Sequence, residues 1–154
     1  VSEALCALAL VTPAAVPGLT LGCVIANVAN IALSGTGALG LLDVAFGSLA
    51  TFLGALFTWR MRRHPLAALA GPVLANALIV PAYLPILLTG VGFYTIPFTS
   101  ISLDGAWPLM YLFGLVTTGA GEAVIMYVLG YPLYRSLART RFVQRELAEV
   151  GTTN

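Results

Sequence analysis

Glu122 is an acidic residue in the middle of a long apolar segment, and its chemistry is the first question that the sequence raises. Between Trp107 and Tyr134 the chain has no other charged residue. An ionised carboxylate is costly in hydrocarbon, so an acid inside a membrane segment normally faces a cavity or a polar pathway. Tyr111 and Thr118 share its helical face, because the three residues are separated by seven and four positions. Glu122 is therefore the first candidate for ligand binding.

Other apolar segments also contain polar side chains, some of them near the expected outer ends of the segments and some on one helical face. They are Glu3, Asn27, Asn30, Asp43, Asn76 and Tyr83. None of these segments contains a cationic residue that would neutralise the acids. Three interpretations of Glu122 therefore stay open. It is protonated and hydrogen-bonded to a neighbouring helix, or solvated in a cavity, or paired with a cationic or N–H-rich ligand.

The composition predicts that these residues belong to an all-α integral membrane protein with a single domain, residues 1–154. Of the 154 residues, 59% are hydrophobic and 8% are charged, whereas soluble domains carry about 25% charged residues. The mean hydropathy is +0.96. A soluble fold of this size leaves too much surface in water to hide so many apolar side chains. Lipid is the natural cover for them, and nothing in the charge pattern suggests a nucleic-acid partner.

Five membrane spans are expected from the lengths of the apolar segments. A spanning helix needs about 20 apolar residues, and proline interrupts helical hydrogen bonding. The first apolar region is therefore divided at the hinge "TPAAVPG". The predicted spans are approximately 2–15, 17–33, 43–59, 66–89 and 107–134, and the polar tail 136–154 follows them.

The arginines orient the predicted spans. All seven basic residues are arginines, and they follow the third span, at residues 60–63, and the last span, at residues 135–145. The positive-inside rule places both clusters and the C-terminus in the cytoplasm. Glu3, Asp43 and the 90–106 loop are then outside, where the loop's aromatic residues indicate either an interfacial belt or a lid. This orientation also puts Val1 outside, so a chain that starts in the cytoplasm would need a sixth, upstream span.

Small residues recur at a spacing of four in three predicted helices. The rows are Gly18, Gly22, Ala26; Gly47, Thr51, Ala55; and Ala67, Gly71, Ala75. Such rows let helix backbones approach closely in lipid. We expect close packing within the protein rather than dimerisation, although some rows are also suited to docking a partner subunit.

Catalytic and cofactor motifs are weak or missing. "GTGALG" at 35–40 matches a dinucleotide fingerprint, but no strand precedes it, so a glycine-rich turn is the better interpretation. The sequence has no GxxxxGK[ST] loop for ATP. His64 lies in the cytoplasmic arginine cluster, while Cys6 and Cys23 are expected to be packing residues, so no metal-ligand cluster is present. We therefore expect neither an enzyme nor a bound cofactor.

Four segments, taken together and in order, resemble the QueT family. They are "VSEALCALALVTPAAVPGLTLGCVIAN", "LLDVAFGSLATFLGALFTW", "PVLANALIV" and "GEAVIMYVLGYPL". Members of that family are substrate-binding S components of energy-coupling factor (ECF) transporters, associated with the uptake of queuosine precursors. The resemblance implies a six-helix bundle, of which this chain supplies helices two to six, with an external ligand cavity. It also implies a partner ECF module, made of a transmembrane coupling subunit and two ATPases that use the ATP. The implied location is a bacterial or archaeal cell membrane.

The implied ligand is a 7-deazaguanine with an aminomethyl group, and the polar residues suit it. Two acids, Glu122 and Glu3, are the candidates for its N–H edge and its ammonium. The candidates for the rest of the site are Asn76, Asn27, Asn30 and Asp43 for polar contacts, and Tyr83, Tyr111 and Trp107 for the flat ring. Alternatives remain: an S component for another vitamin-like molecule or amine, a small membrane carrier outside the ECF class, an intramembrane enzyme, or an assembly subunit without a cavity.

Overall fold

The described part of the computed structural model is helical apart from turns and one isolated bridge between Thr95 and Ser102. It comprises residues 2–34, 37–90, 95, 100, 102, 107–140 and 143–144. The first half of the chain forms η1 (Ser2–Leu10), α1 (Ala15–Ser34), η2 (Gly37–Leu39), α2 (Gly40–Leu42), η3 (Asp43–Gly47) and α3 (Ser48–Arg60). The second half forms α4 (Pro65–Ala68), α5 (Ala70–Gly90), α6 (Trp107–Val124), η4 (Ile125–Gly130) and α7 (Tyr131–Leu137).

Within the described residues, four helical stretches are long and apolar enough to cross a membrane. They are Ala15–Leu33, Gly40–Arg60, Pro65–Ile86 and Trp107–Leu137. Two of them contain a π-helical turn, η3 and η4, in which the hydrogen bonds span one residue more than in an α-helix. These stretches correspond to the last four of the five predicted spans, with bounds that differ by a few residues.

The first predicted span, 2–15, is different in the structure. Residues Ser2–Leu10 form a 3-10 helix of nine residues, which at about 2.0 Å per residue extends only about 18 Å. Most of its side chains are buried by protein: Ala4, Cys6, Ala7, Ala9 and Leu10 lie in the core, and Leu5 is exposed. Burial in a protein core and exposure to lipid require the same apolar residues, so composition alone did not separate the two. The predicted break at "TPAAVPG" is present, because η1 ends at Leu10 and α1 begins at Ala15.

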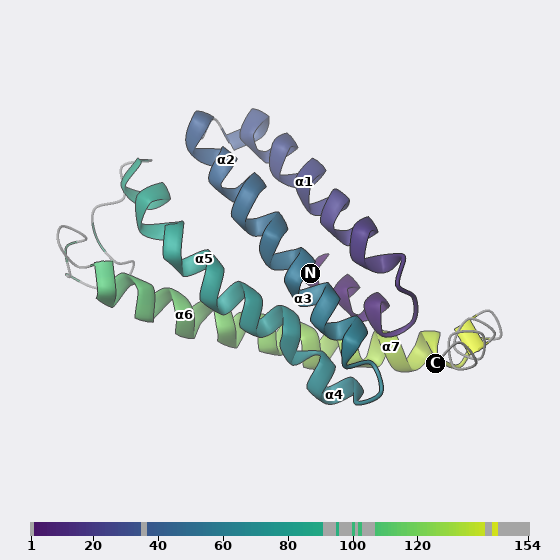
Figure 1. Cartoon of the computed structure of the whole chain (residues 1–154). Helices are drawn as coiled ribbons and strands as arrows, with labels where there is room; N and C mark the ends of the chain where they lie inside the picture. The colour runs from purple at the N-terminus through teal and green to yellow at the C-terminus, as the bar shows by residue number, and fades with distance from the viewer. Residues whose placement is uncertain are drawn as a thin grey trace.

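The long helices pack against one another in chain order, α1 on α3, α3 on α5 and α5 on α6 (Figure 1). Glycines and prolines make these contacts close. A Cβ on Gly54 of α3 would lie 2.7 Å from Pro72 Cα of α5, and one on Gly114 of α6 would lie 2.9 Å from Pro81 Cβ. Gly71 likewise lies against Gly54 and Phe57, as its place in a small-residue row predicted. These contacts leave the facing helices almost no room to slide.

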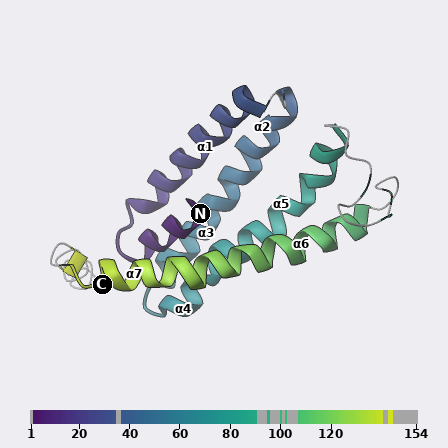
Figure 2. The same cartoon turned by 180° about the vertical axis from the view of Figure 1, so that it is seen from behind.

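The hydrophobic core lies where η1 packs between α3 and the last helical stretch, formed by α6, η4 and α7 (Figure 2). One cluster joins Cys6, Ala7 and Leu10 of η1 to Ala68, Leu69 and Met126. A second joins Ala9 of η1 to Val16 and Ala55. The segment that carries Glu3 is therefore fixed by packing against several different helices.

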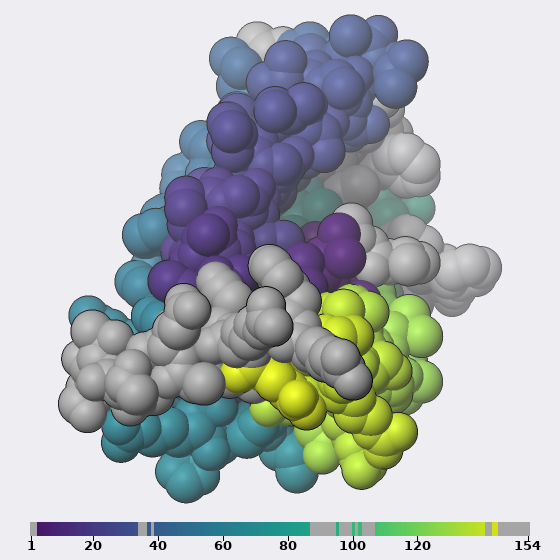
Figure 3. All heavy atoms as spheres, turned by 90° about the vertical axis from the view of Figure 1, so that its right-hand side faces the viewer, coloured from purple at the N-terminus to yellow at the C-terminus, as the bar shows by residue number. Residues whose placement is uncertain are grey.

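Large apolar side chains cover the outside of the helices. On α1 they include Leu21, Ile25, Val28 and Leu33, each at least half exposed. Figure 3 shows the upper part of α1 as an uncovered ridge on that face of the molecule. Such a surface would be unfavourable in water and is suited to lipid. The outer surface thus agrees with the composition: this is a multi-pass α-helical membrane protein.

Candidate functional site

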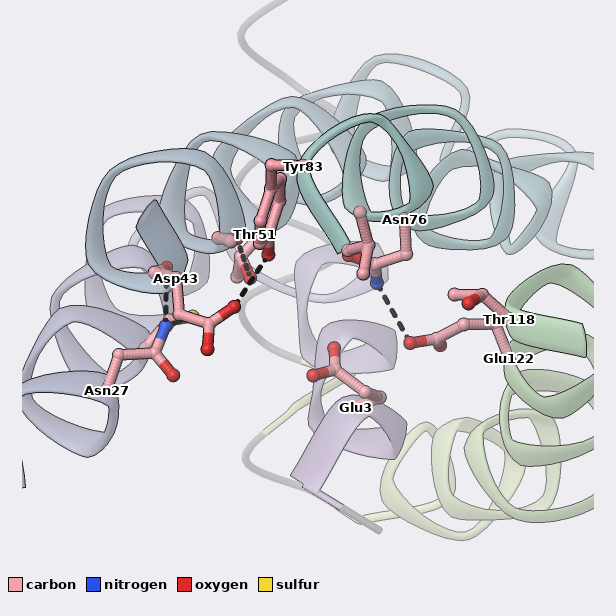
Figure 4. A pocket seen from close by; sticks show the side chains of 11 residues that line it. Glu3, Asn27, Asp43, Thr51, Asn76, Tyr83, Thr118 and Glu122 are labelled. Carbon is pink, nitrogen blue, oxygen red and sulfur yellow. Dashed lines mark hydrogen bonds between the residues drawn. The ribbon is translucent and has the colours of Figure 1, made fainter. Parts of the chain in front are cut away.

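A cavity of about 290 Å³ lies between the helices and gathers most of the predicted polar residues (Figure 4). Its lining consists of Glu3, Cys23, Asn27, Asp43, Gly47, Thr51, Asn76, Val80, Tyr83, Thr118 and Glu122. Six of the nine predicted ligand-binding residues are in this set. They come from η1, α1, η3, α5 and α6, so residues separated by up to 119 positions in the sequence, from Glu3 to Glu122, meet at one site.

Glu122 and Asn76 form a cross-helix pair at one end of the cavity. The Asn76 amide Nδ2 donates to Glu122 Oε1 at 2.9 Å. The second carboxyl oxygen, Oε2, is buried and has no hydrogen-bond partner within the described part of the chain. A buried acceptor without a donor costs free energy, about 1–3 kcal/mol for a neutral group and more for a charged one. Glu122 therefore lines the cavity while one of its carboxyl oxygens has no donor among the described residues.

Asp43 anchors the opposite end of the cavity (Figure 4). The Tyr83 hydroxyl donates to Asp43 Oδ1 at 2.8 Å, and Asn27 Nδ2 donates to the main-chain oxygen of Asp43 at 2.8 Å. The Tyr83 ring stacks on Phe46, with the ring centres 5.6 Å apart. Asp43 is thus hydrogen-bonded in place, whereas Glu122 keeps an unused oxygen.

The π-helical turn η3 shapes this end of the cavity. It contains Asp43 at its start and Gly47 at its end, and both line the cavity. A Cβ on Gly47 would lie 3.2 Å from Asn27 Nδ2 and 3.7 Å from the Tyr83 hydroxyl. Glycine at this position lets α1 and α5 bring their polar side chains close to the turn. Short π-helical turns are frequent at functional sites.

Glu3 extends into the cavity from η1. Figure 4 shows its carboxyl group directed into the same space as that of Glu122. The Cys6 thiol lies 3.8 Å from Glu3 Oε2, within the range of a weak S–H donor. Because η1 is packed in the core, the position of Glu3 is fixed by the fold.

The cavity is acidic. Glu3, Asp43 and Glu122 all line it, and no arginine is among the described residues of its wall. The arginines that the structure describes lie at or just after the end of α3, and in and after α7. Asp43 and Arg60 are 17 residues apart on one helical stretch, which is about 25 Å at 1.5 Å per residue. A cationic ligand would thus meet three acids and no competing basic side chain from the described wall.

Three predicted residues do not line this cavity. Asn30 is exposed on α1, because three residues along a helix turn it about 60° away from Asn27. Trp107 and Tyr111 stack on each other with ring centres 5.5 Å apart, and the Tyr111 hydroxyl donates to Leu78 O at 3.2 Å. Tyr111 does share a face with Glu122 but lies about 16 Å further along the axis.

Other lining residues were not proposed as ligand-binding residues from the sequence. They are Cys23, Gly47, Thr51, Val80 and Thr118. The sequence did contain a signal for Thr118, because it lies four residues from Glu122 and therefore on the same helical face. The remaining four are small or apolar residues that look like packing positions until the neighbouring helix is known. The predicted lid, in the 90–106 loop, falls mostly outside the described residues.

The chemistry of the site is that of binding. Among the residues that the structure describes, no group of three or more His, Cys, Asp or Glu side chains is arranged to hold a metal ion. The lining offers carboxyl, amide and hydroxyl groups at fixed positions, with aromatic surface from Tyr83 beside them. Such an arrangement is suited to holding a small polar, cationic molecule.

Comparison with protein families decides what kind of protein carries this cavity. The family model described as the QueT transporter matches residues 1–139. The chain belongs to the QueT transporter family. Comparisons with curated proteins and with solved structures gave no match. QueT membership agrees with the membrane-spanning helices and identifies the chain as a substrate-binding membrane component for uptake, and it points to transport rather than to catalysis.

Proposed function

We propose that this QueT protein captures a queuosine precursor, a 7-deazaguanine with an aminomethyl group, at the outer face of the membrane for ATP-driven uptake. The observation that carries the proposal is the Glu122–Asn76 pair, in which one buried carboxyl oxygen has no partner among the described residues. A cavity of about 290 Å³ is near the lower limit of ordinary small-molecule sites. It is of the size expected for a single substituted base.

The hydrogen-bonding edge of a 7-deazaguanine complements this pair. Its ring N–H and exocyclic amine are two donors side by side, and a carboxylate accepts such a pair through both oxygens. The remaining Asn76 amide hydrogen is available to the ring carbonyl. Charge-assisted hydrogen bonds of this type are the strong ones. The alternative in which Glu122 is a structural acid, bonded only to its neighbouring helix, would leave Oε2 without a role.

The aminomethyl group of the ligand is a cation and needs an acidic partner. Glu3 is directed into the same space as Glu122, and the Tyr83 hydroxyl holds Asp43 at the other end of the cavity. We assign the ammonium to Glu3, because Glu3 accepts only a weak hydrogen bond from the Cys6 thiol, whereas Asp43 accepts a short one from the Tyr83 hydroxyl. The Tyr83 ring, stacked on Phe46, provides a flat apolar surface for the base.

The outward direction of the cavity is inferred from charge. The described arginines cluster at the other end of α3 and around α7, and positive residues favour the cytoplasmic side. A chain without an ATP-binding loop depends on other subunits for energy. We therefore propose an ECF module, with a transmembrane coupling subunit and two ATPases, as the partner.

The assignment of Glu122 can be tested by isothermal titration calorimetry on the purified full chain in detergent. We expect 7-aminomethyl-7-deazaguanine to bind the wild-type protein. Glu122→Gln replaces one carboxyl oxygen by a donor that faces the ligand's own donors, so affinity should fall by at least about tenfold, equivalent to roughly 1.4 kcal/mol. Tyr111→Phe is the matched control, because Tyr111 lies outside the cavity and should leave affinity unchanged.

Unchanged affinity in Glu122→Gln would reject Glu122 as a ligand residue. Failure of the wild-type protein to bind would reject the 7-deazaguanine itself. A thermal-shift screen with water-soluble vitamins and small amines would then identify the alternative class, because a ligand that binds only the folded state raises the apparent stability.

A further inference from the structure

A groove of about 360 Å³ lies on the exposed face of α3, apart from the acidic cavity described above. Its wall is formed by Leu53, Leu56, Phe57, Arg60 and Met61, and we call it the α3 groove. Four of these side chains are exposed, and Leu56 is half-buried. None of the five lines the acidic cavity. The α3 groove is therefore a separate feature that the proposed capture of a deazaguanine does not use.

The wall of the α3 groove changes from apolar to cationic along the helix axis. Leu53, Leu56 and Phe57 share one helical face, because they are separated by three and four residues. Arg60 follows on that face and is the last residue of the membrane-spanning stretch Gly40–Arg60. From Leu53 to Arg60 the helix rises about 10 Å at 1.5 Å per residue. The apolar part thus lies at the depth of acyl chains, and the guanidinium lies at the level of the lipid headgroups.

Arg60 has no acidic partner within the described part of the chain, where the three acids all line the acidic cavity instead. The guanidinium of Arg62, by contrast, is used inside the protein. Its central carbon lies 3.9 Å from the centre of the Trp59 ring, and Nη1 donates to Trp59 O at 3.2 Å. Arg60 is exposed and makes no comparable contact with a described residue. Its guanidinium is therefore available to an anion.

The α3 groove opens at the basic end of the bundle. The turn between α3 and α4 lies at the same end as α7 in both views (Figure 1, Figure 2). That turn contains Arg62 and Arg63, and α7 contains Arg135. The orientation proposed above places this end at the cytoplasmic leaflet, whose anionic lipids are attracted to basic residues near the membrane surface. The charge of the site and the charge of that leaflet are thus complementary.

We propose that an anionic phospholipid of the cytoplasmic leaflet binds in the α3 groove, with its phosphate on Arg60 and one acyl chain along Leu53, Leu56 and Phe57. A guanidinium presents a planar set of N–H donors that matches two phosphate oxygens. A choline lipid has its own cation beside the phosphate and gains less from Arg60. A free phosphate has no group to cover the apolar wall, and an acidic protein segment would have to enter the depth of the acyl chains to do so.

Native mass spectrometry of the full chain in detergent tests the phosphate contact. The probes are a phosphatidylglycerol and a phosphatidylcholine with the same acyl chains. Wild type should bind the first phosphatidylglycerol at least about tenfold more tightly, and Arg60→Gln should reduce this preference to less than about threefold. Arg63→Gln is the matched control, because Arg63 is also exposed but lies outside the groove, and it should keep the preference. Both substitutions are at exposed positions, so the fold should be preserved.

Leu53→Trp tests the acyl-chain contact. It places a larger side chain in the groove and leaves Arg60 unchanged, so affinity for phosphatidylglycerol should fall by at least about fivefold. Leu129→Trp is its control. Leu129 of η4 is exposed to a similar extent and lies at a similar distance before Arg135, but it is not part of the groove. Inorganic phosphate at the concentration of the lipid should not displace phosphatidylglycerol.

Several results would overturn the inference while leaving the proposed function intact. Equal binding of the two lipids to wild type would make the groove part of the general lipid coat and leave Arg60 to a partner protein. An equal loss of preference in Arg60→Gln and Arg63→Gln would show a diffuse basic surface instead of a site. Displacement by inorganic phosphate, or unchanged affinity in Leu53→Trp, would show an anion site without an acyl-chain contact. Deazaguanine binding is measured separately by calorimetry, so the two proposals can fail independently.

Discussion

At the scale of single residues, two of the three acids that line the cavity have different hydrogen-bond partners. Asp43 receives the Tyr83 hydroxyl on a side-chain oxygen, while Glu122 shares one oxygen with Asn76 and keeps the other unused. The first arrangement links η3 to α5 through Asp43 Oδ1. The second is incomplete and is suited to a ligand. We therefore expect their neighbours to suit Asp43 to a structural role and Glu122 to ligand binding.

Tyr83→Phe should lower the stability of the ligand-free protein. The change removes the hydroxyl that donates to Asp43 but keeps the ring that stacks on Phe46. Hydrogen bonds to charged groups contribute about 1.5–3 kcal/mol, and the melting temperature should fall by about 2–4 °C for each kcal/mol. Thermal unfolding in detergent measures the shift.

Tyr111→Phe is the comparison for that prediction. Its hydroxyl donates to the neutral main-chain oxygen of Leu78 at an exposed position, so the expected loss is about 0.5–1.5 kcal/mol. Equal shifts in the two variants would contradict the structural role given to Asp43.

At the scale of the elements, the register between helices is set by backbone contacts as well as by side chains. Gly54 of α3 faces Pro72 of α5, and Gly114 of α6 faces Pro81. At the end of α3, Thr58 donates to Ala68 O at 3.1 Å. These contacts fix the positions of the helices relative to one another along their axes. As a result, Asp43 lies beside Tyr83 and Asn76 lies beside Glu122.

Gly54→Ala should destabilise the protein. The new Cβ would lie 2.7 Å from Pro72 Cα, a backbone atom that cannot rotate away, so the two helices must separate. Overpacking of this kind typically costs about 1–3 kcal/mol. In the same thermal unfolding experiment, Gly121→Ala should be neutral or slightly stabilising, because its Cβ meets nothing within 4 Å. Similar melting temperatures for the two variants would show that α3 and α5 have more freedom than these contacts allow.

At the scale of the whole molecule, the chain combines a lipid-facing exterior with a small polar cavity, and its sequence has no nucleotide loop. The proposed ECF function places binding in this chain and energy supply in partner chains. That division distinguishes the proposed ECF component from an independent carrier.

Proteoliposomes test this division directly. The chain alone, with ATP and Mg²⁺ on the cytoplasmic side, should bind radiolabelled 7-aminomethyl-7-deazaguanine without accumulating it. Addition of an ECF module should produce uptake that stops when ATP is replaced by a non-hydrolysable analogue. Accumulation by the chain alone would favour the carrier alternative.

The sequence predicted the helical membrane fold because lipid imposes long apolar segments and helical backbone on any spanning element. It predicted much of the cavity wall for a related reason. Glu122, Asn76 and Asp43 are polar side chains in membrane segments, where burying a polar group costs free energy. It did not predict that Ser2–Leu10 is a short buried helix, since core and lipid select the same side chains. It also grouped Tyr111 with the ligand-binding residues. Sequence spacing shows that Tyr111 and Glu122 share a helical face, but it does not show how far along the helix axis the cavity extends.

The π-helical turn η3 has an evolutionary consequence. A π-helical turn contains one residue more than an α-helical turn, so loss of one residue between Asp43 and Gly47 would convert it into an ordinary helix. The helix on either side would keep its register, because the turn holds the extra residue without rotating its flanks. The widened turn at this end of the cavity would be lost, so the shape of the cavity is sensitive to single-residue insertions and deletions as well as to substitutions.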